Sequence, residues 1–163
     1  MTRDEVLERL TTARAVFDDK VAAVAVDALA LPVPGGTHSV KDIVAHVTAY
    51  DDLIVLRLVA ARRGTTTAFD RDRAGWEAFN ERIWREVAEL PADVVLARAK
   101  DVFVSLVHEV SGLTDEELNA AVAATAALDP AWLGGRAPWE LIAIDAYDHH
   151  PLHYAALDAA AGV

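Results

Sequence analysis

The segment SVKDIVAHVTAYDDLIVLRLVAARRG, from Ser39 to Gly64, predicts one long amphipathic helix. Ser39 and Asp42 form an S-x-x-D capping box, so the helix is expected to begin just after Ser39. Gly64 follows the last periodic residue and is expected to end it. Apolar side chains recur every three or four residues, as on one face of a helix, and these are Ile43, Val47, Tyr50, Ile54 and Leu58. The segment should therefore bury one face against neighbouring helices.

The same helical spacing of apolar residues, with capping and helix-ending residues between the segments, continues on both sides of this helix. The predicted helices are, in order, 3–28, 39–63, 74–87, 91–111, a short one after Thr114, and 138–160, with a polar loop at 64–73 and a second loop at 123–137. No alternation typical of a strand exceeds four residues. We therefore predict an all-α fold, a four-helix bundle with additional short helices, in a single domain over residues 1–163.

The composition limits both the chemistry and the partners. The chain of 163 residues has no cysteine, which leaves imidazole and carboxylate groups as the only good metal ligands. Its formal net charge of −11 predicts that nucleic acid is not a partner, because phosphate binding needs clustered cations. We expect no signal peptide, since MTRDEVLERL is charged throughout, and no membrane span, since the longest apolar run is interrupted by Asp27. The expected location is cytoplasmic.

The histidines near the carboxyl end have the spacing of a metal half-site. His149 and His153 are four residues apart, so on a helix they lie on one face with β-carbons about 5–6 Å apart. Asp145, one turn earlier, is placed to hold a ligand ring by its other nitrogen. A third ligand must come from another helix, and His46 is the candidate. The alternatives are a hydrogen-bonded structural role for His46 and a surface pair at 149 and 153.

The remaining histidines and Pro151 carry separate expectations. His150 is about 100° round the helix from His149, so it should face away from the pair, as a polar lid or a proton shuttle. His108 is assigned to solvent, and His38 is a loop residue without an evident partner. Pro151 removes a backbone hydrogen bond and is expected to cause a kink or bulge between His149 and His153. The motif is not H-E-x-x-H, which argues against a metalloprotease.

The opening segment is similar to the second-helix signature of the DinB-like four-helix bundles, in which a W-S-V-K-D motif leads to the first metal histidine. RAPWELIAIDAYDHHPLH, residues 136–153, resembles the last helix of the ClbS/DfsB branch of that family, and residues 79–118 resemble its middle. The resemblance covers nearly the whole chain. It implies three metal ligands, which are His46, His149 and His153.

Three positions depart from the motifs of the branch. His38 stands where the motif has tryptophan, His150 replaces a tyrosine, and Leu152 replaces a glutamate. None of these departures affects His46, His149 or His153. The resemblance therefore implies the three ligands, and it implies less about substrate binding or catalysis.

Three neutral imidazoles leave a divalent ion with open coordination positions, as in catalytic sites. Ligand softness favours zinc or nickel. Together with the resemblance, this predicts a metal-dependent transferase or hydrolase that adds water or a low-molecular-weight thiol to a reactive small-molecule substrate, in detoxification or self-resistance. Asp42, Tyr50 and His150 are the candidates for proton handling, although a helix cap and a core aromatic are the simpler interpretations of Asp42 and Tyr50.

Two further interpretations stay open at this point. The bundle could sequester a small molecule without catalysis, or it could be a structural homodimer. In both, the tryptophans only pack, and these are Trp76, Trp84, Trp132 and Trp139.

Overall fold

The computed structural model describes residues 1–65, 67–72, 75–120 and 136–162, and every regular element within them is helical. The α-helices are α1 (Arg3–Ala22), α2 (Val40–Arg62), α3 (Ala68–Asp72), α4 (Gly75–Val87), α5 (Ala92–Ser111), α6 (Asp115–Asn119), α8 (Pro138–Ile142) and α9 (Tyr154–Ala161). Shorter segments of 3-10 or π geometry are η1 (Val26–Ala28), η3 (Ala143–Tyr147) and η4 (His150–His153). The predicted all-α fold is confirmed.

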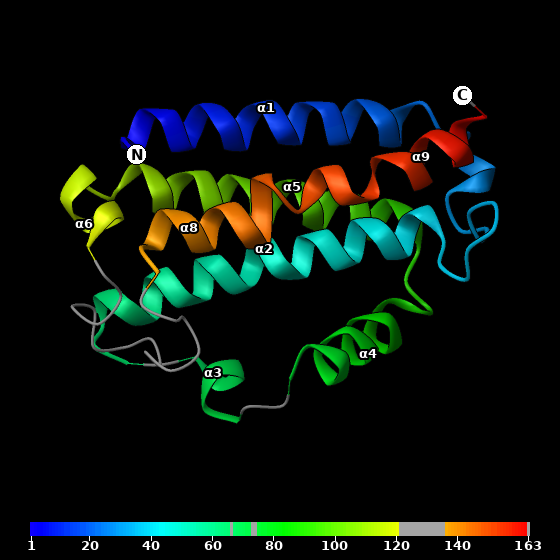
Figure 1. The fold of residues 1–163 in the computed structure, drawn as a ribbon. Coiled ribbons are helices and arrows are strands. Elements are labelled where there is room, and N and C mark those ends of the chain that lie inside the picture. The colour runs from blue at the N-terminus through cyan, green and yellow to red at the C-terminus, as the bar shows by residue number, and fades with distance from the viewer. Residues whose placement is uncertain (66, 73–74, 121–135, 163) are drawn as a thin grey trace.

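Four long segments lie side by side and make the bundle: α1, α2, α5 and the broken segment from α8 to α9 (Figure 1). The smaller helices α3 and α4 lie outside these four. The core between the long segments is apolar, with Leu10, Leu106 and Leu157 fully buried. Burying one such leucine stabilises the fold by about 1.5–3 kcal/mol. None of the described helices is both long and apolar enough to cross a membrane.

The helices begin where the capping boxes predict. Thr2 accepts a hydrogen bond from the backbone of Glu5 at the start of α1, and Ser39 accepts one from Asp42 at the start of α2. The predicted faces of α2 and α4 are directed inward, with Ile43, Val47 and Ile54 buried on α2 and Phe79, Ile83 and Val87 buried on α4. Local periodicity therefore determined these two helices.

Two segments differ from the prediction. α1 ends at Ala22 rather than near residue 28, because the chain turns there and its Leu29 carbonyl accepts a hydrogen bond from the Lys41 backbone at 2.9 Å. α3 occupies the end of the predicted polar loop; its start is capped by Thr67, whose hydroxyl accepts from the backbone of Asp70. That T-x-x-D spacing was the available signal. The loop predicted at 123–137 lies almost entirely outside the described residues.

Lys41 attaches α4 to the beginning of α2. Its buried ammonium group donates to the carbonyl oxygens of Val87, Ala88 and Leu90 at 2.9, 2.8 and 3.2 Å. A cation at this position satisfies carbonyl groups that a helix end leaves unpaired. The contact holds α4, and with it Trp84, beside the first turns of α2.

Candidate metal centre

The last long segment is irregular just where the histidines lie. In η3 the backbone of Asp148 donates to the carbonyl of Ala143, five residues back, at 2.9 Å, which is a π-type bond. The 3-10 turn η4 follows, with Pro151 inside it, and α-helical geometry resumes at Tyr154. The irregularity predicted between His149 and His153 corresponds to the 3-10 turn η4, whereas the π-type turn η3 precedes His149 and was not predicted.

His46, His149 and His153 converge through their Nε2 atoms. Nε2 of His149 lies 3.1 Å from Nε2 of His46 and 3.2 Å from Nε2 of His153. All three ligand atoms lie within 4.8 Å of one another. The imidazole ring centroids are 5.0 to 5.1 Å apart, and the rings meet edge to face.

The two short separations between these nitrogens fit one shared ion. Two nitrogens bound to a tetrahedral zinc at 2.0–2.1 Å are about 3.3 Å apart, which is close to the two short separations here. Nδ1 of His46 and Nδ1 of His149 are buried without a hydrogen-bond partner among the described residues. The three rings therefore turn the same nitrogen, Nε2, toward a common point.

Burial keeps these imidazoles neutral. Desolvation, reinforced by the neighbouring histidines, lowers the pKa of His46 to about 3 and that of His153 to about 4. Desolvation also lowers the pKa of His149, and the nearby backbone of Asp145 partly opposes that shift. The contact is loose, because Nδ1 of His149 makes no hydrogen bond to a described residue. Metal binding requires the neutral form of imidazole, so at neutral pH all three rings are in the form that binds a cation.

Tyr50 packs against the same cluster. Its ring centroid lies 4.8 Å from that of His46 and 4.6 Å from that of His149. The Tyr50 hydroxyl donates to Oδ1 of Asn80 at 3.2 Å, and burial raises its pKa. Asn80 comes from α4 and was not identified from the sequence, because its relation to the site depends on how α4 docks.

Asp42 and Asp145 have other partners. Oδ2 of Asp42 accepts from the backbone nitrogen and hydroxyl of Ser39 at 2.8 and 2.7 Å, which is the helix cap. Oδ2 of Asp145 accepts from Arg57 at 2.9 Å. Burial raises the pKa of Asp145 to about 6 against the opposing effect of Arg57. The Asp145 carboxylate therefore engages an arginine rather than a histidine ring.

His150 faces away from the pair, as expected from the helical period, but it lies in the core rather than at the surface. Its side chain is fully buried, and its Nε2 lies 3.3 Å from Oδ1 of Asp51. Oδ2 of Asp51 is 3.7 Å from Nη1 of Arg14, which is also buried. A surface lid is incompatible with this position. The contact instead joins the segment after His149 to α2 and α1.

A cavity of about 430 Å³ adjoins the triad, and His46 and His153 form part of its wall. The lining also includes His38 and Trp84, whose rings stack with centroids 4.0 Å apart. Neither residue was predicted to contribute to a site. His38 is in a turn and Trp84 is on α4, so their pairing has no local sequence signal. His108, by contrast, is exposed on α5 as predicted.

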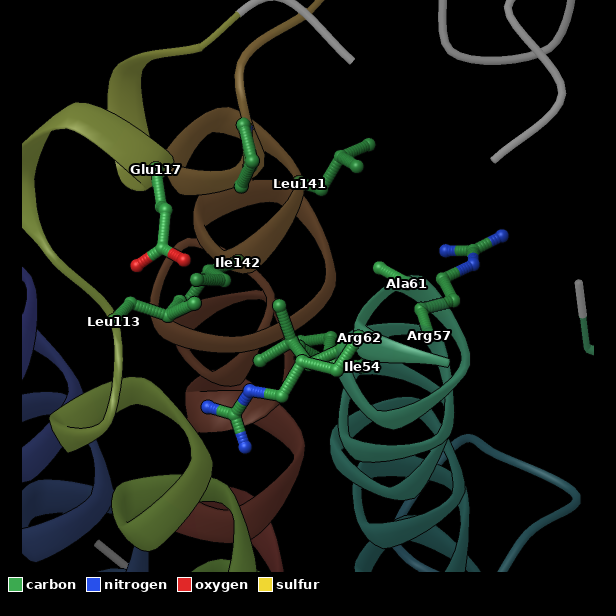
Figure 2. A pocket seen from close by; sticks show the side chains of 10 residues that line it. Ile54, Arg57, Ala61, Arg62, Leu113, Glu117, Leu141 and Ile142 are labelled. Carbon is green, nitrogen blue, oxygen red and sulfur yellow. The ribbon is translucent and has the colours of Figure 1, made fainter. Parts of the chain in front are cut away.

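A second cavity of about 120 Å³ lies between α2, α6 and α8 (Figure 2). Ile54 of α2 and Ile142 of α8 contribute apolar walls, and Arg62 lies at its edge, where it pairs with Glu109. Ile54 is eight residues beyond His46, about 12 Å along the helix axis. This cavity is therefore separate from the histidine cluster.

The fold and the site together define a class of protein: helical bundles that carry a three-histidine cluster beside a cavity. The chain belongs to the DinB superfamily, whose sequence profile matches residues 5–142. The matched range includes His46 and ends before His149 and His153. No curated protein matches the sequence.

Solved structures of the same fold cover 96% of this chain. The colibactin self-resistance protein ClbS, in complex with double-stranded DNA, has a TM-score of 0.80 at 16% identity, with 94% of that chain covered. An uncharacterised protein from Escherichia coli UTI89 has a TM-score of 0.80 at 15% identity over 90% of that chain. A protein from Streptococcus pneumoniae has a TM-score of 0.79 at 11% identity over 88%. ClbS among these neighbours agrees with the resemblance to the ClbS/DfsB branch.

The prediction that nucleic acid is not a partner is contradicted by the ClbS structure, because a protein of this fold was crystallised with double-stranded DNA. The physical reason lies in the argument from net charge. Net charge sums over the whole surface, whereas phosphate binding depends on where cations cluster locally. A charge of −11 was therefore not a sufficient ground for excluding this class of partner.

Proposed function

We propose that the chain binds one divalent metal ion, zinc or nickel, through His46, His149 and His153, and promotes transferase or hydrolase chemistry on a reactive small molecule. The observation that carries the proposal is the convergence of three Nε2 atoms within 4.8 Å from two segments distant in the chain. When bound, such an ion supplies Lewis-acid activation of water, of a thiol or of an electrophile. Three protein ligands leave room in the coordination sphere for a reactant.

The surrounding residues prepare the site in distinct ways. Tyr50 closes one side by packing on two of the rings, and Asn80 fixes the direction of its hydroxyl. We assign the Tyr50 hydroxyl, which lies on a ring packed against the cluster, as the candidate proton donor to a leaving group. The cavity beside His46 and His153 gives a small molecule access to the cluster. Asp42 is committed to the α2 cap, so we assign it no chemical step.

Metal content of untagged protein tests the ligand set. We expect about one ion per chain in the wild type, and loss of that ion in His46→Ala and in His149→Ala. His108→Ala is the matched control, because His108 is exposed on α5 and should leave the metal content unchanged. Equal metal content in all four proteins, or no uptake of zinc or nickel by the wild type, would contradict the proposal.

Two probe reactions test catalysis. Hydrolysis of 4-nitrophenyl acetate reports water as the nucleophile, and arylation of a small thiol by 1-chloro-2,4-dinitrobenzene, with release of chloride and a proton, reports thiol transfer. We expect at least one reaction to require metal. On an ester with an alkoxide leaving group, which must be protonated as it departs, Tyr50→Phe should lower kcat by about 100- to 10,000-fold while the metal content is preserved. A metal-loaded protein that accelerates neither reaction would favour the sequestering alternative.

A further inference from the structure

The cavity beside the triad has a wall of nearly parallel aromatic rings. Trp84 stacks on His38 with ring centroids 4.0 Å apart and an angle of 23° between the planes. The Trp84 ring is also within 22° of parallel to His46, with centroids 6.5 Å apart. All three side chains line the same cavity. His38 covers one face of the Trp84 ring, which leaves the rest of its cavity-lining surface for a flat ligand.

The rest of the lining is largely aliphatic, with Thr37 and Asp42 as its polar members, and carries no positive charge. Val33, Ile43 and Ala156 provide aliphatic surface, and no lysine or arginine is among the described residues that line the cavity. Lys41, the residue next to Asp42, directs its ammonium group to the carbonyl oxygens at the end of α4 instead. The lining carboxylate among the described residues, on Asp42, accepts hydrogen bonds from Ser39 through its Oδ2. Away from the histidine cluster, a carboxylate or phosphate group would find no lysine or arginine among the described lining residues to pair with.

We propose that this cavity binds a planar, uncharged, largely apolar molecule that stacks on Trp84 and presents one polar atom to His46 and His153. The volume of about 430 Å³ is that of a small-molecule site. The presentation of a polar atom to the cluster rests on the proposed metal function, whereas stacking on Trp84 does not require a metal. His38 and Trp84 thus become specificity-determining residues for the proposed reaction.

Hydroxamic acids test the proposal on the zinc-loaded protein, because they share one metal-binding head and differ in the attached group. Benzohydroxamic acid carries a neutral aryl ring, acetohydroxamic acid lacks it, and 4-carboxybenzohydroxamic acid adds a charge to the ring. Aromatic stacking predicts that the benzo compound binds about two- to twelvefold more tightly than the aceto compound. The carboxylate should abolish that preference.

Variants of the wall assign the preference to its residues. Trp84→Ala should bring the ratio of the two dissociation constants close to one, and Trp84→Phe should retain most of the preference, because phenylalanine keeps a ring. His38→Ala should give an intermediate ratio. Zinc content measured on each variant shows whether the histidine cluster is intact, so loss of the ratio is separable from loss of the fold.

A readout without metal separates this inference from the proposed function. Metal-free protein is titrated with 2-naphthol while the indole N–H signal of Trp84, assigned through Trp84→Phe, is followed by NMR. A shift of that signal in a protein that binds no zinc would leave the cavity inference standing while the proposed function fails. Equal binding of the benzo and aceto compounds by zinc-loaded wild type, or a preference that persists in Trp84→Ala, would overturn the inference alone.

Discussion

At the scale of single residues, Asp145 shows burial and an ion pair acting in opposite directions on one carboxyl group. Its pKa is raised to about 6 in the folded chain by burial, in spite of Arg57. The unfolded chain releases this proton near the ordinary pKa of aspartate, about 4. Between these values the folded state binds more protons than the unfolded state, so this group lowers stability as the pH rises.

Asp145→Asn should remove that dependence. We expect the free energy of unfolding of the wild type to fall relative to the variant as the pH rises from about 4 to about 7, with a constant difference above that range. Urea denaturation at a series of pH values measures the difference. A difference that is independent of pH would show that Arg57 cancels the effect of burial on the pKa of Asp145, and a wild type that gains stability relative to the variant as the pH rises would show that Arg57 outweighs it.

The sequence could predict some of the site residues for physical reasons that are local. The i, i+4 spacing of His149 and His153 places two rings on one face, and the structure brings them together. His46 was a candidate from its place on a long helix, and the resemblance to a family strengthened it, because its distance to the pair depends on how two helices pack. His38, Trp84 and Asn80 had no such signal, since each reaches the site through the docking of a turn or of α4.

At the scale of elements, the bulge around Pro151 determines how the two C-terminal ligands are directed. Pro151→Ala restores a backbone donor and removes a clash, so the segment can return to regular α-helix. We expect the variant to be as stable as the wild type or up to about 3 kcal/mol more stable, while zinc affinity falls by about tenfold. Chemical denaturation and competition with a chromophoric chelator measure the two effects. Unchanged affinity would show that the bulge does not direct the ligands.

The contact between Asp51 and His150 fastens the same segment to α2. Asp51→Ala leaves Arg14 without one of its acidic neighbours in the core, although Asp18 remains 2.8 Å from it. Removal of one partner from a buried charged network costs about 3 kcal/mol or more. Unfolding in urea measures this loss.

Asp52→Ala is the matched control for Asp51→Ala. Asp52 is the next residue on α2, and its partner Arg98 is largely exposed. An ion pair of this kind contributes about 0–1 kcal/mol. Similar losses in the two variants would mean that the Asp51 contact contributes no more than a surface pair.

At the scale of the whole molecule, metal binding should raise thermal stability, because the site is assembled only when two distant segments are folded together. At a free zinc concentration 100 times the dissociation constant, binding adds about 2.7 kcal/mol. For a domain of this size that corresponds to an increase in Tm of about 5–10 °C. Differential scanning calorimetry should show the increase in the wild type and in His108→Ala and not in His46→Ala. An equal increase in His46→Ala would place the binding elsewhere.

The bundle itself was predictable because its long helices are specified locally. Capping boxes and a steady apolar period define α2 and α4, and the same devices start α1. What the period could not supply was the early end of α1, which follows from a tertiary hydrogen bond to Leu29, and the position of α3 and α4 outside the long helices. Global charge was a poor guide to partners for the same reason, since it carries no information about position.

The ammonium group of Lys41 has a chemical consequence. The sequence has three lysines, Lys20, Lys41 and Lys100, and only an amine with a free lone pair reacts with an acylating reagent. The Lys41 ammonium group donates hydrogen bonds to three carbonyl oxygens and is buried, so Lys41 should be acylated far more slowly than Lys100. Acylation at Lys41, measured by peptide mass spectrometry, would therefore report how often the end of α4 separates from α2 and displaces the indole of Trp84.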